Sequence, residues 1–262
     1  MKKEKKSFRY RFITWIGYHF FPKFHVEGLE NLPENESCMI IGNHSQVYGP
    51  IACELYMKEK FKIWCAYEVM DKKVFKDYAY ESFWGNKPKW IKWIYYPISR
   101  LAPIFTKVFT DAHTLPVYRG LRIKSTFALA SKALDEGYNN ILFVENYNLY
   151  NNIINEFKLG FVDFAKNYYY RTKRKLKFVP MYVAPKLKTI YLGKPIEYVP
   201  GLNVDEERKI IIKHLQDEIT NIAISLPLHV VVPFKNSTKK DWPTNIPLID
   251  YTKDNTNDKI DD

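Results

Sequence analysis

The sequence has few cysteines and too few acidic residues to balance its basic ones. Its 262 residues include three cysteines, Cys38, Cys53 and Cys65, an odd number without CxxC spacing. This pattern argues against a disulfide framework and against a zinc ribbon, so we expect free, buried thiols in a reducing compartment. The 40 Lys and Arg exceed the 29 Asp and Glu, which gives a formal net charge of +11. Such a surface attracts polyanions such as anionic lipid headgroups, nucleic acid and phosphorylated small molecules.

Long apolar runs are also missing. No stretch reaches the roughly 18 uncharged apolar residues that a membrane-spanning helix needs: residues 90–109 are interrupted by charges and prolines, and residues 222–234 are too few. The N-terminus lacks a secretory signal, because its basic start is followed by Arg9, Arg11 and His19 rather than by an apolar core and a cleavage site. We therefore expect a cytoplasmic chain, which could still lie on a membrane surface.

Residues 8–21, FRYRFITWIGYHFF, predict an amphipathic helix. One face would carry the apolar side chains Phe8, Phe12, Ile13, Trp15, Ile16 and Phe20, with Tyr10, Arg11, Thr14 and Tyr18 opposite. A basic start followed by an aromatic amphipathic helix is typical of an interfacial anchor, so residues 1–23 are predicted to form a membrane-interface segment. The alternative is a helix packed on the protein's own core.

Apolar runs alternate with helical patterns over residues 24–234. We expect strands at 37–42, 62–66, 115–118, 140–145, 178–183 and 188–192, and helices at 50–60, 124–136, 157–169 and 204–225. The alternation predicts one α/β domain with a mostly parallel central sheet flanked by helices. The polar residues 235–262 are expected to form a flexible tail.

Residues 71–114 are too long for a simple crossover and contain WGNKPKWIKW. Tryptophan mixed with lysine suits a membrane interface. Burial of this segment against the sheet is the alternative.

Four features lie where predicted strands end: His44, Arg119, Glu145 and Pro180. In an open parallel sheet, ligands bind beyond the carboxyl ends of the strands. A lone histidine at such a position is more often structural than catalytic, but the other three features favour a site.

The order of these segments resembles the glycerolipid (lysophospholipid) acyltransferase family, which includes 1-acylglycerol-3-phosphate acyltransferases. NHSQVYG at 43–49 is similar to the family's NHxxxxD block, and Arg119 in LPVYRG to its arginine block. FVEN at 143–146, followed by EFKLGFVDFA, resembles the FPEGT block and its continuation, and FVPMYV at 178–183 resembles the VP-containing strand. The resemblance covers roughly residues 24–225.

The resemblance implies transfer of an acyl group from a thioester carrier, acyl-CoA or acyl-carrier protein, to a hydroxyl of a lysophospholipid. His44 would be the general base, Arg119 would bind the acceptor's phosphate, Glu145 would organise the acceptor pocket and Lys158 would help to bind substrate. No metal or resident cofactor is implied. The expected partners are the anionic membrane surface, the lysolipid and the acyl donor, with the protein peripheral or monotopic on the cytoplasmic face.

Gly49 occupies the position of the family's aspartate, so the HxxxxD motif is degenerate. In a serine-protease triad, spoiling the analogous aspartate costs about 10⁴ in kcat, roughly 5.5 kcal/mol. A substitute acid would have to be Glu145, Glu54 or Glu68. FVENYN also lacks the proline and glycine of FPEGT. The main alternative is therefore a catalytically impaired acyltransferase-like protein that binds lipid or a partner enzyme.

Two other functions receive less support. Ser45 does not lie in a GxSxG elbow, which disfavours a hydrolase. Residues 167–177, NYYYRTKRKLK, mix aromatic and basic side chains as single-strand binders do, but a solvated basic face or contact with lipid headgroups explains them as well. No nucleic-acid fold motif is recognisable, so no nucleic-acid partner is expected.

Overall fold

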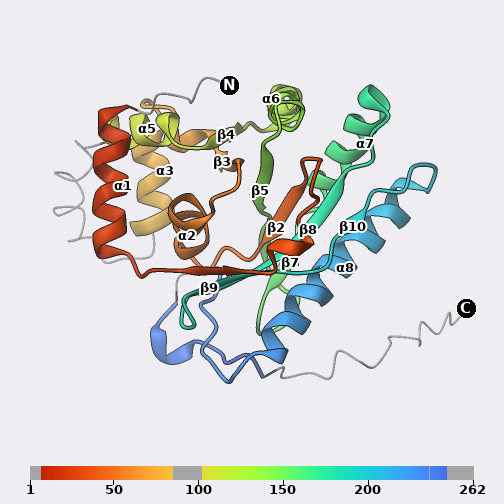
Figure 1. Cartoon of the computed structure of the whole chain (residues 1–262). Helices are drawn as coiled ribbons and strands as arrows, with labels where there is room; N and C mark the ends of the chain where they lie inside the picture. Colours follow the sequence, from red (N-terminus) through yellow and green to blue (C-terminus); the bar gives the residue numbers. More distant parts are fainter. Residues whose placement is uncertain (1–6, 85–101, 236, 247–262) are drawn as a thin grey trace, which may run out of the picture.

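The computed structural model of the chain describes residues 7–84, 102–235 and 237–246 (Figure 1). Their centre is an eight-stranded sheet in the order β1-β9-β8-β2-β5-β3-β4, with β10 paired to β8. Its strands are β1 (His25–Glu27), β2 (Met39–Gly42), β3 (Phe61–Ala66), β4 (Thr114–Val117), β5 (Asn139–Phe143), β8 (Lys177–Ala184), β9 (Thr189–Leu192) and β10 (Ile196–Glu197). Only the pairings of β8 with β9 and with β10 are antiparallel in this sheet as described. The predicted mostly parallel sheet is confirmed.

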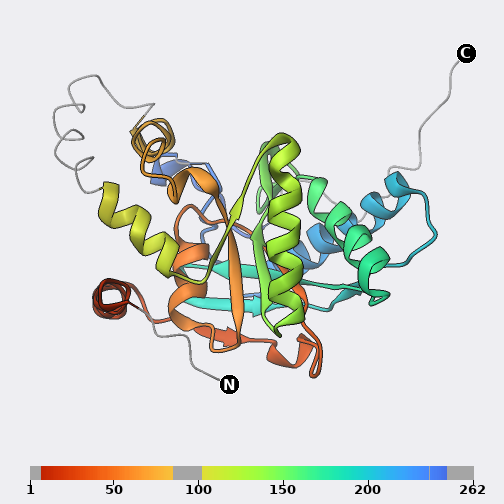
Figure 2. The same ribbon diagram turned by 90° about the horizontal axis from the view of Figure 1, so that it is seen from above.

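Helices cover both faces of the sheet (Figures 1 and 2). Successive residues of a strand point to opposite faces, and β2 shows this directly: Met39 and Ile41 pack with one core, and Ile40 with the other. The first core includes residues of α6 (Ile123–Asp135), α7 (Gly160–Thr172) and α8 (Val204–Ser225), whereas the second includes residues of α2 (Tyr48–Tyr56). The α6–α8 layer and α2 therefore lie on opposite sides of the sheet.

The first helix, α1 (Phe8–Phe20), packs on α2 and α5 (Ala102–Asp111). Its contact face is the one that carries Tyr10 and Gly17, because Tyr10 is buried and Gly17 lies directly against Leu55. The predicted apolar face is open: Phe8, Phe12, Trp15 and Phe20 are 81%, 51%, 55% and 82% exposed. The helix therefore packs on the rest of the protein, as the alternative predicts, but it does so through the side that carries Tyr10 and Gly17, and the aromatic side chains of its apolar face stay open.

The helix predictions hold except for α2 and for α7, which begins and ends three residues later than the predicted 157–169 because Phe157 belongs to β7. For α8 the predicted range 204–225 is the observed one, and its N-cap Asn203 accepts a hydrogen bond of 3.0 Å from the backbone N–H of Asp205. Helix α2 differs from the prediction because it starts before Pro50 and ends at Tyr56 rather than at residue 60. Proline tolerates this position because it still lies in the first turn, where the backbone N–H has no intrahelical acceptor.

A small hairpin was missing from the sequence prediction. It consists of β6 (Glu145–Leu149) and β7 (Asn155–Phe157), and it follows β5 after a break at Val144. The predicted strand 140–145 therefore ends earlier, at Phe143. Polar residues dominate both hairpin strands, so no apolar alternation marks them.

Three predicted segments lie partly outside the described residues. In 71–114, α3 (Phe75–Trp84) and α5 are described and contact each other, but 85–101 are not. Residues 1–6 and 247–262 are likewise outside. Within the predicted tail, Asn245 is buried and its amide donates to Ala223 O at 2.8 Å. Short 3-10 helices complete the chain: η1 (Leu29–Asn31), η2 (Tyr67–Val69), η4 (Gly120–Arg122) and η5 (Lys239–Asp241).

In the described part of the chain, no helix combines the length and apolarity that crossing a bilayer requires.

Candidate functional site

The residues at the carboxyl ends of β2, β5 and β4 gather at one edge of the sheet. Asn43 and His44 follow β2, Glu145 begins the hairpin after β5, and Arg119 follows β4. Since these strands belong to one parallel run, their carboxyl ends share an edge, which is where open α/β sheets bind ligands. The predicted location of the site is consistent with this arrangement.

Asn43 fixes the start of the loop after β2. Its side-chain oxygen accepts a hydrogen bond from Val183 N–H at 2.6 Å, and its amide donates to Val183 O at 3.0 Å. The same amide donates to Ser45 Oγ at 2.8 Å, and all three residues are buried. The Asn43 side chain therefore ties the loop to β8 just where the backbone pairing of β2 and β8 ends.

The loop then turns sharply and brings a backbone carbonyl to His44. Ser45 and Gln46 have φ angles of 45° and 55°, a left-handed conformation that costs non-glycine residues roughly 1–2 kcal/mol each. In this turn His44 Nδ1 donates to the carbonyl oxygen of Gln46. A carbonyl can only accept, so the proton of neutral His44 resides on Nδ1 and Nε2 carries the lone pair.

The environment of the His44 ring leaves Nε2 available. The ring contacts Phe143 and Phe234 edge to face, at centroid distances of 5.3 and 5.6 Å. Nε2 has no hydrogen-bond partner among the described residues. It is also not among the fully buried polar atoms that lack a partner. Burial lowers the pKa of His44 below 6.5, the charge of Lys158 acts in the same direction, and the Gln46 carbonyl opposes both. His44 is thus neutral at neutral pH.

Glu145 is buried and holds the loop after β2 in place through the backbone of His44. Its two carboxyl oxygens accept hydrogen bonds from the backbone N–H groups of His44, at 2.5 Å, and Asn155, at 3.1 Å. Burial raises the pKa of Glu145 to about 7, although the two N–H donors favour its ionised form. The sequence predicts a residue that binds the acceptor or replaces the missing acid, but this geometry makes Glu145 a positioning residue.

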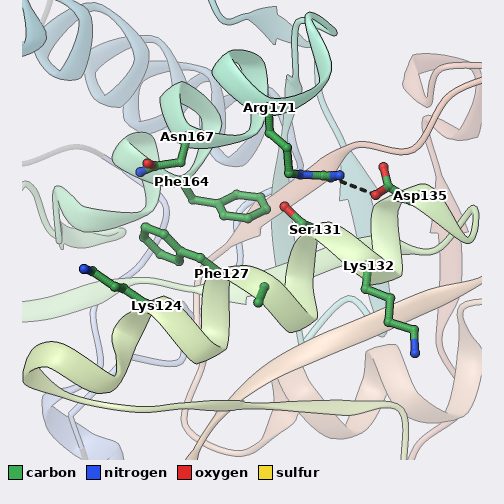
Figure 3. Close-up of a pocket in the computed structure, with 9 residues that line it drawn as sticks. Lys124, Phe127, Ser131, Lys132, Asp135, Phe164, Asn167 and Arg171 are labelled. Atoms are coloured by element: carbon green, nitrogen blue, oxygen red, sulfur yellow. Dashed lines mark hydrogen bonds and ion pairs between the residues drawn. The ribbon is translucent and has the colours of Figure 1, made fainter.

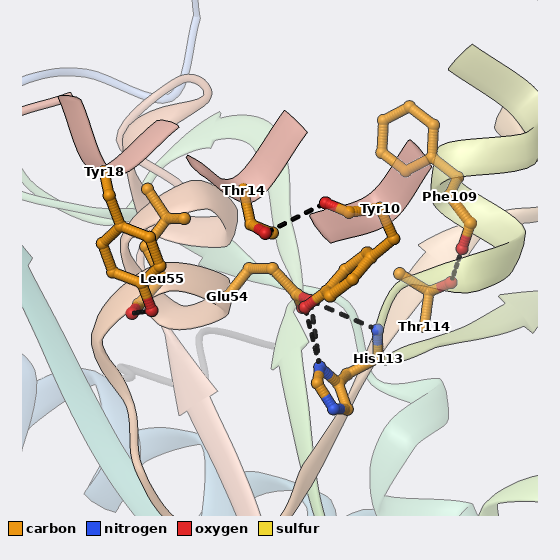
Figure 4. A network of polar contacts seen from close by, with 8 residues as sticks. All are labelled: Tyr10, Thr14, Tyr18, Glu54, Leu55, Phe109, His113 and Thr114. Atoms are coloured by element: carbon orange, nitrogen blue, oxygen red, sulfur yellow. Dashed lines mark hydrogen bonds and ion pairs between the residues drawn. The ribbon is translucent and has the colours of Figure 1, made fainter. Parts of the chain in front are cut away.

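The other two candidate acids are engaged elsewhere. Glu54 Oε1 accepts from the Tyr10 hydroxyl and lies 2.9 Å from His113 Nδ1 (Figure 4), where α1 meets α2. Glu68 Oε1 lies 3.3 Å from Arg119 Nη2. Among the described residues, no carboxylate bonds to the ring of His44. The Gln46 carbonyl occupies the place that the family resemblance assigns to an aspartate.

Gly49 has no room for that aspartate. A Cβ at this position would lie 2.7 Å from the backbone oxygen of His44 and 2.7 Å from Phe143 Cε1. A backbone atom cannot move aside as a flexible side chain can, so the loop itself would have to shift. Glycine here matches the tight path that brings Gln46 O to the imidazole.

Arg119 and Lys158 are exposed at the same edge but at different distances from His44. Arg119 is separated from the β2 end by β5 and β3, about three strand spacings or roughly 14 Å. Its side chain is 78% exposed. Lys158 follows the hairpin, and its backbone N–H donates to Val144 O at 2.9 Å. Only an elongated ligand could contact His44 and Arg119 together.

Sequence reasoning missed three groups at the site: Phe234, Phe143 and the Gln46 carbonyl. Phe143 lies within the FVEN block, but the resemblance assigns a role only to the glutamate of that block. Phe234 comes from the far end of the chain and carries no motif, although it contacts both His44 and Tyr147. The role of a backbone carbonyl depends on the φ angles of the loop, which no residue type announces.

No protein-family model matches the sequence. No curated protein matches it either. Among solved structures, the chain is similar to the crystal structure of the 1-acyl-sn-glycerophosphate (LPA) acyltransferase PlsC from Thermotoga maritima. The two share 13% sequence identity with a TM-score of 0.47, and the match covers 83% of this chain and 81% of that chain. A likeness of this degree establishes neither family nor activity.

Proposed function

We propose that this protein is a membrane-associated O-acyltransferase that moves a fatty acyl group from a thioester carrier to a hydroxyl of a lysophospholipid or related lipid. The observation that carries the proposal is the state of His44. Its Nδ1 proton is held by the Gln46 carbonyl, and Nε2 is left open with its lone pair. This is the state that a general base needs before it accepts a proton.

The reaction would proceed in two proton transfers through Nε2. As the acceptor hydroxyl attacks the thioester carbonyl, His44 takes its proton and a C–O bond forms. When the tetrahedral intermediate collapses, the C–S bond breaks and the imidazolium returns the proton to the departing thiolate. Atoms and charges balance without a metal ion, and the products are an ester and a free thiol.

The neutral partner of His44 sets the expected speed. A carbonyl fixes the tautomer as a carboxylate does, but it stabilises the imidazolium less because it carries no full charge. In the serine-protease triad, the loss of about 10⁴ in kcat on replacing the aspartate arises partly because the histidine then adopts the wrong tautomer. Since the tautomer is right here, the loss should be smaller, and we expect a slow but real enzyme.

Binding of an elongated amphiphile fits the remaining charges. Arg119 would contact a phosphate or another anion of the acceptor, and Lys158 would stand nearer to the reacting hydroxyl. The separation of roughly 14 Å between the β2 and β4 ends favours a ligand that extends along the edge of the sheet. A lysophospholipid has this shape and charge.

Membrane association is supported by the exposed aromatic face of α1. Phe8, Phe12, Trp15 and Phe20 form an open apolar stripe, and Arg9 and Arg11 are exposed on the same helix. Aromatic side chains together with arginines favour the headgroup region of an anionic bilayer. The acceptor would be drawn from that bilayer, on the cytoplasmic face.

The alternative is an acyltransferase-like protein that binds lipid or a partner enzyme without turnover. The specific observation in its favour is that no carboxylate among the described residues reaches the His44 ring. Both functions predict lipid binding, so only turnover separates them.

The deciding experiment incubates the full chain with palmitoyl-CoA or palmitoyl-acyl carrier protein and a panel of lysophospholipids, and measures acylated product. We expect product with the wild type and a loss of about 10²–10⁴ in rate for His44→Ala. His25→Ala, which removes an exposed histidine from β1, is the matched control and should retain the rate. Wild-type product no higher than that of His44→Ala would assign the non-catalytic function.

A further inference from the structure

A groove lies between α6 and α7, away from the His44 site (Figure 3). It has a volume of about 520 Å³ and is open to solvent along its length. From Lys124 to Asp135 the α6 wall extends about 16 Å, or three helical turns. The groove therefore has the length of a short helical segment.

The floor of the groove is aromatic and firmly packed. Phe127 of α6 and Phe164 of α7 meet edge to face at 5.3 Å, and Trp64 of β3 lies beneath both, at 6.3 and 5.5 Å. The α6 wall beside this floor carries the small side chains Ala128 and Ser131. Small residues let another backbone approach closely. Phe164 is already fully buried, so the apolar area left to cover comes from Phe127, which is partly exposed, and from Ala128.

The rim is basic, most clearly at the end near the sheet edge. Lys124 is exposed and makes no ion pair with the described residues, whereas Lys132 lies 3.9 Å from Glu136. Arg171 is paired with Asp135 at 2.7 Å at the far end. From residue 119 to residue 134 the chain holds four basic residues and no acidic one, and the first carboxylate of α6 after them is Asp135: the basic residues are Arg119, Arg122, Lys124 and Lys132.

The position of the groove relates it to both the site and the membrane face. Helices α6 and α7 start after β4 and β7, at the edge of the sheet where His44 lies, and run away from it. Helix α1 packs on α2, on the opposite side of the sheet (Figure 2). A protein attached to a membrane through α1 therefore leaves this groove facing the aqueous phase.

We propose that the α6–α7 groove docks an acidic amphipathic helix of the protein that carries the acyl thioester. The occupant's apolar side chains cover Phe127 and Ala128, and its carboxylates face Lys124 and Lys132. This inference rests on the proposed acyl transfer, because it names the donor of that reaction. Helix α6 packs on β4 and β5, and β4 lies three strand spacings, roughly 14 Å, from β2, whose end carries His44. A carrier docked in the groove therefore needs a long flexible arm to deliver its thioester.

The first test measures binding without turnover. Fluorescence anisotropy follows labelled palmitoyl-acyl carrier protein as the full chain is added. We expect Lys124→Glu/Lys132→Glu, and separately Ala128→Trp, to weaken binding at least tenfold. Lys194→Glu/Lys209→Glu changes the net charge equally at exposed positions outside the groove and should bind as the wild type does. Equal binding by all variants, or no binding by the wild type, would overturn the proposal.

The second test separates this proposal from the proposed function. The ratio of kcat/KM for palmitoyl-acyl carrier protein to that for palmitoyl-CoA should fall at least tenfold in Lys124→Glu/Lys132→Glu, through KM. An unchanged ratio would overturn the docking site while leaving acyl transfer intact. If neither donor reacts but groove-dependent carrier binding persists, the enzyme is refuted and the docking site stands. If the groove variants lose vesicle binding instead of carrier binding, the groove faces lipid and the proposal is wrong.

Discussion

At the scale of single residues, His44 determines how activity should depend on pH. A general base works only when neutral, and burial lowers the pKa of His44 below 6.5. We therefore expect kcat/KM to be constant near neutral pH and to fall below pH 6.5 as the ring becomes protonated. Lys158→Gln should move this fall to higher pH because it removes a positive charge that opposes protonation, whereas Lys158→Arg should leave it in place. A pH–rate profile identical in all three proteins would contradict this view of the site.

Glu145 makes a separate prediction about stability. Its pKa in the folded protein, about 7, lies above the ordinary value of 4.5, so the folded state binds an extra proton between these values. The stability contributed by this group is thus present at low pH and is lost as pH rises through 7. Relative to Glu145→Gln, the wild type should lose about 2.5 kcal/mol between pH 5 and pH 8. Denaturant unfolding of both proteins at several pH values measures the difference, and a constant difference would refute the shift.

Gly49 can be tested with a matched glycine. A Cβ at Gly49 would meet a backbone oxygen at 2.7 Å, whereas a Cβ at Gly160 would meet nothing within 4 Å. Gly49→Ala should therefore destabilise the protein by about 1–3 kcal/mol, and Gly160→Ala should be neutral or slightly stabilising. Gly49→Asp should be less stable than the wild type and should not restore a fast enzyme. Thermal unfolding measures the relative stability of these variants. A Gly49→Ala variant as stable as Gly160→Ala would show that the loop after β2 can shift at little cost.

At the scale of elements, α1 packs on the protein with one face and leaves its aromatic face open, so the two faces can be tested separately. Phe12 and Trp15 are about half exposed and lie away from Leu55. Phe12→Ser/Trp15→Ser should weaken binding to phosphatidylglycerol-containing vesicles at least tenfold, because burying these side chains is worth about 1.5–3 kcal/mol each when complete. The unfolding temperature should hardly change, since surface substitutions usually stay within about 0.5 kcal/mol.

The matched control for α1 replaces exposed apolar residues elsewhere. Leu121 and Leu228 are 90% and 68% exposed, so Leu121→Ser/Leu228→Ser removes comparable apolar surface. We expect this variant to bind vesicles like the wild type in a sedimentation assay. Equal loss in both variants would mean that α1 is not the contact face.

The elements that the sequence predicts well are those with a strong local pattern. The 3.6-residue periodicity and the acidic first turn of α8 place it correctly, and the buried strands β2 and β8 stand out as apolar runs. The β6–β7 hairpin is polar, and contacts such as the hydrogen bond from Asn155 N–H to Glu145 form only when the chain is folded. Strand order and the open face of α1 likewise depend on tertiary packing. For the site, the sequence predicts the edge of the sheet at which it lies. It also indicates His44, through the similarity to the NHxxxxD block, but it indicates neither the Gln46 carbonyl nor Phe234.

At the scale of the whole molecule, helix α1 and the α6–α7 groove lie on opposite sides of the sheet. The two proposals together therefore predict that membrane and carrier can bind at once. Palmitoyl-acyl carrier protein should sediment with anionic vesicles only when the full chain is present. Phe12→Ser/Trp15→Ser should release both proteins from the vesicles while the affinity for the carrier in solution is retained. Lys124→Glu/Lys132→Glu should stay on the vesicles, as Lys194→Glu/Lys209→Glu should, but should no longer bring the carrier with it.

Salt should weaken both contacts, because both would draw on the net charge of +11. Carrier docking should weaken more than vesicle binding, since α1 would also bind lipid by burying aromatic side chains, which salt does not screen. Mutual exclusion of vesicles and carrier would place both on one surface and contradict this arrangement.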